Sequence, residues 1–253
     1  MDEKRIYQKK INVQTEYVRD FYNQRAKSVA DRPEAYTTVL LGDGNPQYAK
    51  QWDAYEKEYI LPKLQLTGTK NVLDIGCGMG RWTKSTAPLC NQYVGVDFSP
   101  DMIHLAQKQF SKPPYDKCSF FNLSFDEAMH DERILGMSFG AVIIAGVSMY
   151  VNDEMLRKCY DSLKNVLSGG AVVYIEESAA VKDRLTLNHI WSDVLQSDYD
   201  AIYRTREEYL DLLKPLLQDC IILEEGYMNP LDKKEFTDTT HWYAVLRYAV
   251  QDS

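Results

Sequence analysis

The segment that most constrains the fold of this chain runs from Val72 to Trp82 and reads VLDIGCGMGRW. A short apolar run containing Asp74 is followed by three glycines, which let the chain turn sharply and let a ligand approach the backbone. The spacing fits neither the Walker loop, which ends in Gly-Lys-Ser/Thr, nor the G-x-G-x-x-G dinucleotide fingerprint. We therefore expect a strand, a glycine loop and a helix that wrap a nucleoside carrying a small zwitterion.

A second acidic residue, Asp97, ends the next apolar stretch, which begins at Tyr93. A carboxylate at the end of the second strand can accept hydrogen bonds from both hydroxyls of a ribose, so Asp97 is the predicted ribose ligand. Ser99 is the predicted N-cap of the following helix, whose apolar residues, Met102 among them, face the sheet.

The apolar runs predict seven strands, at about 71–75, 92–96, 118–122, 140–145, 171–176, 220–224 and 241–248. Helical stretches separate most of them, and this alternation is typical of an α/β fold with a doubly wound, mostly parallel sheet. Between the fourth and fifth strands we expect a helix that starts at Asn152 or Asp153 and ends at Gly169-Gly170. Ligands of such sheets bind at the carboxyl ends of the strands.

Four segments, in the right order and spacing, resemble the motifs of the class I S-adenosylmethionine-dependent methyltransferases. They are residues 73–80, 96–102, 139–153 and 167–177. The resemblance covers about residues 68–250. It implies a Rossmann-like sheet of seven strands with the last one antiparallel, and S-adenosyl-L-methionine as the cofactor.

Strand ends and resemblance together predict the cofactor site. The expected residues of the glycine loop and the neighbouring strand ends are Asp74, Gly76, Cys77, Gly78, Gly80, Arg81, Trp82, Asp97, Phe98, Ser99, Met102, Ala145 and Gly146. Arg81 either pairs with the carboxylate of the cofactor's methionine part or is a surface charge. Tyr22 and Arg25 look like N-terminal residues that close over this carboxylate in related enzymes, and the alternative is a solvated helix face.

The segment after the third strand departs from the family pattern. Related enzymes commonly place an acidic residue there against the adenine amino group, whereas this chain has Asn122-Leu123-Ser124-Phe125. We expect Asn122 or Ser124 to supply the polar contact and Phe125 to stack on the base.

Two regions lie outside the core and are expected to form a lid that carries substrate choice. Residues 1–67 form an N-terminal helical cap, and residues 177–215 form an insertion after the fifth strand of a cofactor-binding domain that spans 68–253. An aromatic stripe in the cap comprises Tyr48, Trp52, Tyr55 and Tyr59. Aromatic residues at this spacing more often pack a helix against the sheet than form a substrate-binding pocket.

The net charge, the apolar runs and the cysteines exclude several classes of function. The net charge of −8 argues against a nucleic-acid substrate, because neutralising phosphates requires a basic face. No apolar run approaches the roughly 20 residues that span a bilayer, and residues 1–5 lack the core of a signal peptide, so a cytoplasmic protein is expected. Five widely spaced cysteines without a C-x-x-C pair indicate reduced thiols and no metal site. The sequence leaves open whether the protein forms a homodimer.

A sulfonium methyl group transfers by in-line displacement, so the protein must mainly orient the acceptor and exclude water. A hydroxyl or ammonium acceptor needs a base, for which Tyr150, Glu177 and His189 are the candidates. A carboxylate acceptor needs none, and Arg204 or Arg206 would orient it. For His241, sheet packing is the favoured interpretation.

The sequence thus predicts an S-adenosylmethionine-dependent methyltransferase that acts on a small polar metabolite. A sugar, sugar nucleotide, or precursor of a surface glycan or natural product, methylated on O or N, is the preferred acceptor. Small carboxylic acids are the alternative. An NAD-dependent oxidoreductase and a non-catalytic S-adenosylmethionine-binding module are the alternatives of other classes, and the acceptor and the methylated atom stay open.

Overall fold

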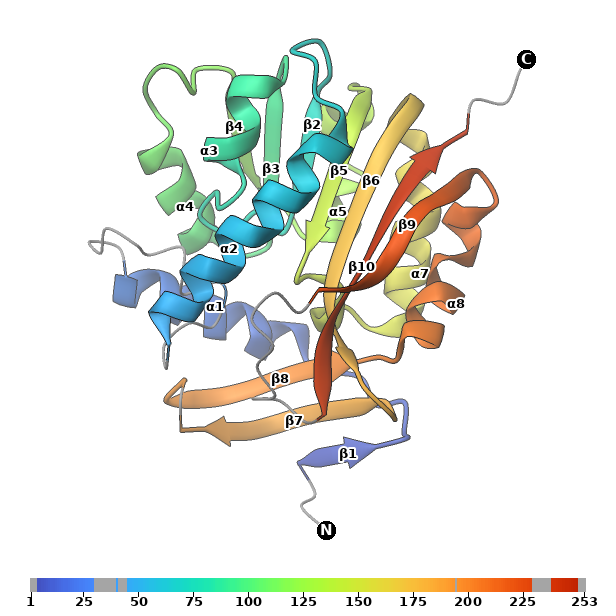
Figure 1. Cartoon of the computed structure of the whole chain (residues 1–253). Coiled ribbons are helices and arrows are strands. Elements are labelled where there is room, and N and C mark those ends of the chain that lie inside the picture. Colours follow the sequence, from blue (N-terminus) through green and yellow to red (C-terminus); the bar gives the residue numbers. More distant parts are fainter. Residues whose placement is uncertain (1–3, 30–39, 41–44, 194, 229–237, 250–253) are drawn as a thin grey trace.

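A sheet of seven strands forms the centre of the computed structural model, which describes residues 4–29, 40, 45–193, 195–228 and 238–249 (Figure 1). The strands are β2 (Val72–Ile75), β3 (Tyr93–Asp97), β4 (Cys118–Asn122), β5 (Phe139–Ala145), β6 (Leu167–Ala180), β9 (Cys220–Met228) and β10 (Thr239–Tyr248). Their order is β4-β3-β2-β5-β6-β10-β9, and β10 runs antiparallel to both of its neighbours. The predicted Rossmann-like sheet is confirmed.

Helices cover both faces of this sheet. One face packs against α2 (Pro46–Ile60), η2 (Leu61–Leu64), η3 (Ala87–Leu89) and α4 (Pro100–Gln109), while the short α3 (Thr83–Thr86) follows the glycine loop. The opposite face packs against α5 (Phe125–Ala128), α6 (Glu132–Leu135), α7 (Asp153–Ser162), η5 (Leu163–Asn165) and α8 (Arg206–Leu217). In Figure 1, α2 crosses the front of the sheet and α7 and α8 lie behind it.

Alternation along the strands assigns each side chain to one of these two cores. In β6, Val172 and Tyr174 belong to the core under α2, whereas Val173 and Ile175 belong to the core under α7 and α8. Successive side chains of a strand point to opposite faces, so this parity continues into the polar end of β6 and decides which residues reach the site.

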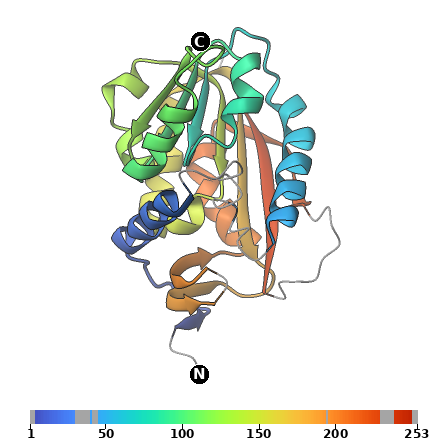
Figure 2. The same ribbon diagram turned by 90° about the vertical axis from the view of Figure 1, so that its left-hand side faces the viewer.

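A second, smaller sheet lies below the carboxyl ends of the parallel strands (Figures 1 and 2). Its order is β1-β7-β8, formed by β1 (Arg5–Tyr7), β7 (Leu185–Ser192) and β8 (Ser197–Tyr203). Helix α1 (Thr15–Val29) packs between the two sheets through a cluster that includes Val18, Phe21 and Tyr199. The N-terminal segment is therefore helical but also adds a strand, and the insertion is mainly a β-hairpin.

The helix before β6 ends earlier than the sequence pattern predicts. Helix α7 stops at Ser162, and Gly169 and Gly170 lie inside β6, where its register on β5 shifts. Gly170 has a φ of +72°, which glycine adopts without strain. Strand pairing begins at Leu167, opposite Phe139, so the two glycines form the irregularity of a strand and are not a helix terminator.

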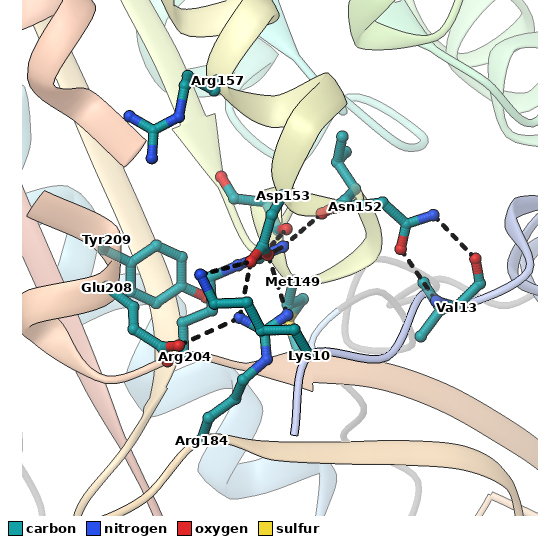
Figure 3. A network of polar contacts seen from close by, with 12 residues as sticks. Lys10, Val13, Met149, Asn152, Asp153, Arg157, Arg184, Arg204, Glu208 and Tyr209 are labelled. Carbon is teal, nitrogen blue, oxygen red and sulfur yellow. Dashed lines mark hydrogen bonds and ion pairs between the residues drawn. The ribbon is translucent and has the colours of Figure 1, made fainter. Parts of the chain in front are cut away.

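The loop after β5 is fixed by a buried ionic network (Figure 3). Asp153 accepts hydrogen bonds from Arg184 at 2.9 and 3.1 Å and from Arg204 at 2.8 Å. Asn152 exchanges two hydrogen bonds with the backbone of Val13, at 2.9 and 3.0 Å. This loop therefore ties the large sheet to β7, to the start of α8 and to the N-terminal segment.

Candidate functional site

A cavity of about 460 Å³ lies at the carboxyl ends of β2, β3, β5 and β6, between the glycine loop, α2 and the turn η4 (Ser148–Tyr150). Its volume is in the range of pockets for small molecules and cofactors. The predicted site residues that line it are Tyr22, Asp74, Gly76, Cys77, Gly78, Arg81, Trp82, Asp97, Phe98, Ser124, Phe125, Ala145, Gly146 and Tyr150.

Asp97 is held rigidly at the end of β3. Its Oδ2 accepts a hydrogen bond from the Gly78 backbone N–H at 2.9 Å, and its Oδ1 accepts one from the Ser99 N–H at 2.8 Å. Burial raises the pKa of the Asp97 carboxyl to about 6, although these two N–H groups oppose the shift. Each carboxylate oxygen has a further lone pair, so Asp97 can still accept two hydrogen bonds from a ligand.

Asp74 has a partner that the sequence did not reveal. The hydroxyl of Tyr93, on the neighbouring strand, donates a hydrogen bond to its Oδ2. Burial raises the pKa of the Asp74 carboxyl to about 7, against the effect of the Tyr93 hydrogen bond. Near neutral pH this carboxyl is therefore divided between its charged and neutral forms.

Arg81 is buried, so it is not a surface charge. Its Nη1 lies 2.5 Å from Glu56 Oε2 and 3.0 Å from Asp53 Oδ1, both on α2. Tyr174 donates to Glu56 at 2.9 Å, and Lys57 pairs with Asp53 at 2.7 Å. Burial raises the pKa of Glu56, while its attraction to Arg81 opposes this. This cluster anchors α2 to the glycine loop.

The residues at and after the end of β4 support the site through their side chains. Asn122 donates from Nδ2 to the Asp97 carbonyl at 2.9 Å and does not line the cavity. Ser124 lines the cavity and caps α5. Phe125 packs edge-on against Tyr160 in the core and reaches the cavity wall. Asp126, which the prediction left out, also lines the cavity, and its position one residue beyond the quoted segment explains the omission.

Tyrosine hydroxyls connect α1 to the cavity wall. Tyr22 donates to the Tyr150 hydroxyl at 2.8 Å, and the Tyr150 and Tyr199 hydroxyls are also 2.8 Å apart. Burial raises the pKa of Tyr22 to about 12 and that of Tyr150 well above its usual value, so neither phenol is a ready base. Arg25 lies over the ring of Phe21, 5.0 Å from its centroid, and does not line the cavity. It is buried, so the solvated-face alternative is wrong for Arg25.

Three further cofactor candidates are not among the residues that line the cavity. Ser99 is the N-cap of α4 as predicted, and its hydroxyl donates to Asn23 at 2.6 Å. Met102 packs in a small core with Ala26 and Met79. Gly80 has a φ of +88° and lies against Phe110, which leaves no room for a side chain.

The structure contradicts two of the three predicted bases. Glu177 is fully buried and lies outside the cavity lining, because it accepts hydrogen bonds from the backbone N–H groups of Val147, Ser148 and Met149. It thus shapes the loop after β5. His189 lies on β7, outside the cavity lining, where Nδ1 is 3.3 Å from Asp200 Oδ2.

The predicted acceptor-orienting arginines are also placed elsewhere. Arg204 is fully buried, pairs with Asp153, and donates to the carbonyls of Ser148 and Val151 at 2.7 and 2.6 Å. Arg206 pairs with Glu225 on β9. Neither lines the cavity, so both predictions are wrong, and Arg204 acts through the loop that it braces.

The far wall of the cavity includes Trp52 and His241, for which the sequence favoured a packing role, and Glu176 and Ser178, which it did not single out. Trp52 of α2, Glu176 and Ser178 of β6, and His241 of β10 line it. His241 Nδ1 lies 2.7 Å from Glu176 Oε1, and the His241 ring stacks on Trp52 with centroids 3.9 Å apart. The aromatic stripe of α2 is divided, since Tyr48 also lines the cavity while Tyr55 and Tyr59 stack on each other at the surface. Strand parity separates Glu176 from Glu177 only once the helices on each face of the sheet are known.

A metal-binding role finds no support in the described part of the chain, where no group of three or more His, Cys, Asp or Glu side chains could hold a metal ion. Likewise, none of the described helices has the length and apolar character to cross a membrane.

Residues 72–170 match the family model described as a methyltransferase domain. Nodulation protein S of Rhizobium tropici is 25% identical over 134 residues, which cover 52% of each chain. Phosphoethanolamine N-methyltransferase 1 of Triticum aestivum is 27% identical over 51% of this chain and 26% of its own length. A 23S rRNA (uracil(1939)-C(5))-methyltransferase of Pasteurella multocida is 27% identical over 32% of this chain and 18% of its own. The chain thus spans about half or less of the length of these curated relatives.

Solved structures support the same fold. An S-adenosylmethionine-dependent methyltransferase of Leishmania major superposes with a TM-score of 0.62 at 16% identity, covering 89% of this chain and 82% of that one. Phosphoethanolamine N-methyltransferase 1 of Haemonchus contortus gives a TM-score of 0.65 at 20% identity, and the match covers 95% of this chain and 51% of that one. These matches identify residues 72–170 as a methyltransferase domain and give the described chain the fold of the solved S-adenosylmethionine-dependent methyltransferases.

Proposed function

We propose that this protein transfers a methyl group from S-adenosylmethionine to a small polar acceptor. The observation that carries the proposal is a single cavity that joins the glycine loop and Asp97 on one side to Glu176 and His241 on the other. One wall has the features of a nucleoside site, and the other presents polar groups that a nucleoside does not need. Methyl transfer requires the donor and the acceptor to be held side by side, which one continuous cavity allows.

The residues present fit the donor. Asp97 retains acceptor capacity on both carboxylate oxygens for the ribose hydroxyls. Gly146 lines the cavity with a φ of +70°, and a Cβ built there would meet no atom within 4 Å, so the backbone is open to a ligand. Asp74 and Tyr22 also line the cavity. When bound, S-adenosylmethionine supplies an electrophilic methyl group on a sulfonium.

A sugar, sugar nucleotide or related precursor is our proposed acceptor. Carboxylates and aromatic rings line the acceptor side, and these groups suit hydroxyl- and amino-bearing rings. Two relatives are named as a nodulation protein and a phosphoethanolamine methyltransferase, which supports a small molecule. A carboxylic acid fits less well, because Arg81, the arginine among the described lining residues, is already paired with Glu56 and Asp53.

The test is methyl transfer from S-adenosyl-[methyl-¹⁴C]methionine to a panel of amino sugars, sugars, sugar nucleotides and carboxylic acids, followed by mass spectrometry of the labelled product. We expect label in a sugar or amino-sugar compound and little transfer with Asp97→Ala. Binding of S-adenosylmethionine without transfer to the panel or to a metabolite extract would instead indicate a non-catalytic binding module.

A further inference from the structure

The acceptor side of the cavity contains a hydrogen-bonded pair, His241 and Glu176, whose Nδ1 and Oε1 atoms are 2.7 Å apart. The two residues come from adjacent antiparallel strands, β10 and β6. Trp52 covers one face of the imidazole, with 28° between the ring planes. The ring is therefore held from two sides while it lines the cavity.

This arrangement fixes the tautomer of His241. An ionised carboxylate only accepts hydrogen bonds, so the proton of a neutral imidazole lies on Nδ1 and is donated to Glu176. The lone pair then lies on Nε2, which makes Nε2 the atom that can take a proton from a ligand. Around the ring, β6 contributes Glu176 and Ser178, α2 contributes Trp52, and β9 contributes Met228. The nearby Glu56 is neutralised by Arg81.

The charge of the lining favours a cation. Five carboxylates line the cavity. Asp74 and Asp97 belong to the donor side, Asp126 and Glu127 follow β4, and Glu176 lies beside His241. Arg81, the arginine among the described lining residues, is ion-paired with Asp53 and Glu56 of α2. Tyr48 also lines the cavity, and an aromatic ring can attract an ammonium group through its π electrons.

We propose that the methyl acceptor is an amine that enters as an ammonium ion, that His241 Nε2 removes its proton, and that Glu176 is the positioning residue for His241. This inference rests on the proposed methyl transfer. The freed nitrogen lone pair forms the new C–N bond while the C–S bond breaks and leaves its electron pair on the neutral thioether sulfur. The product is a methylated ammonium ion, and the proton stays on His241 until solvent removes it.

The chemistry of the base agrees with this choice. An alkylammonium, with a pKa near 10 as in lysine, is a far better proton donor to an imidazole than an alcohol is. A carboxylate acceptor carries no proton, so it would leave the His241–Glu176 pair without a role.

A binding experiment tests the acceptor class without turnover. The chain has four histidines, so ¹⁵N-histidine NMR of the protein saturated with S-adenosylhomocysteine resolves His241 easily. We expect ethylammonium to shift the His241 signals saturably, acetate to leave them unchanged, and His189, outside the cavity, to stay fixed. Glu176→Gln should weaken ethylammonium binding at least tenfold. Saturable binding of acetate, or no response to ethylammonium, would overturn the amine assignment.

Kinetics then test the role of His241, with glucosamine and glucose as probes that differ in one amino group. We expect transfer to glucosamine, with an acidic limb in the pH profile of kcat/KM. The pH profile of the His241→Asn variant should lack this acidic limb, and its kcat should be about 10²–10⁴-fold lower. The variant should still bind S-adenosylhomocysteine. His104→Asn, on the exposed side of α4, is the matched control. Transfer to glucose alone, or an unchanged pH profile in His241→Asn, would overturn the inference and leave the methyltransferase intact. Amine binding without any transfer would instead contradict the proposed function.

Discussion

Glu176 and Glu177 are consecutive residues of β6, yet their carboxylates have opposite surroundings. Glu176 lies on the α2 face, where it bonds to His241 at the cavity. Glu177 lies on the other face, where its oxygens accept three backbone N–H groups from the loop after β5. One carboxylate thus faces a ligand, and the other holds the loop that forms part of the cavity wall.

Glu177→Ala is expected to destabilise the protein by about 3–5 kcal/mol, because it leaves the buried N–H groups of Val147, Ser148 and Met149 without an acceptor. Urea unfolding measures the change. Glu154→Ala, which removes an exposed carboxylate paired with Lys158, should leave the urea midpoint nearly unchanged. Equal losses in the two variants would show that Glu177 does not brace the loop.

The two arginines at the start of the α8 segment should differ in the same way. Arg204→Met leaves Asp153 with one buried partner fewer and takes a charged donor from the carbonyls of Ser148 and Val151, so a loss of about 3–5 kcal/mol is expected. Arg206→Met breaks a pair with Glu225 that is about one third exposed at the arginine, and about 1 kcal/mol or less is expected. Thermal or urea unfolding distinguishes the two outcomes, and a larger loss in Arg206→Met would contradict the role given to Arg204.

Asp74 should make stability depend on pH. Burial raises its pKa from 3.8 to about 7, so the folded state holds this proton more tightly than the unfolded chain. The resulting stabilisation is complete below about pH 4 and is lost as the pH rises through about 7. Asp74→Asn removes this titration and should flatten the fall in unfolding free energy between these limits by up to about 1.4 kcal/mol per pH unit. The exposed Asp116→Asn is the control, and an unchanged slope in Asp74→Asn would contradict the shift.

Substitution of Trp52 should weaken binding of the acceptor and leave binding of the donor unchanged. Trp52→Leu removes the ring that stacks on His241, so we expect the KM of the acceptor found in the transfer assay to rise about tenfold, as for the loss of an aromatic contact of about 1.4 kcal/mol. The dissociation constant of S-adenosylhomocysteine should change less than twofold. Tyr55→Leu, at the surface of the same helix, should change neither constant. A selective loss of donor binding in Trp52→Leu would place this wall on the donor side.

Sequence alone predicted the seven strands and placed Asp97 beside the glycine loop, because both features depend on short stretches of chain that fold locally. It missed the partners of Arg81, which come from α2, some 25 residues earlier in the chain. It also missed His241, since only the register of β10 on β6, with His241 opposite Ser178, brings that side chain to the cavity. His241 and Glu176 are 65 positions apart in the sequence, so no local spacing brings them together.

The insertion shows a signal that was present but not used. Leu185 and Leu187 alternate with polar residues, as do Tyr199 and Ala201, and this period of two predicts the strands β7 and β8. The choice of Glu177 over Glu176 has a different origin. Both lie at the end of one strand, and only knowledge of which helices cover which face separates them.

The central claim is that the glycine loop and Asp97 bind S-adenosylmethionine, and calorimetric titration with S-adenosylhomocysteine and with NAD tests it most directly. We predict that the wild-type protein binds S-adenosylhomocysteine and not NAD, that Asp97→Ala weakens this binding by about 1.5–3 kcal/mol through lost charged hydrogen bonds, and that Asp116→Ala leaves it unchanged. Binding of NAD without S-adenosylhomocysteine, or an unchanged dissociation constant in Asp97→Ala, would contradict the account.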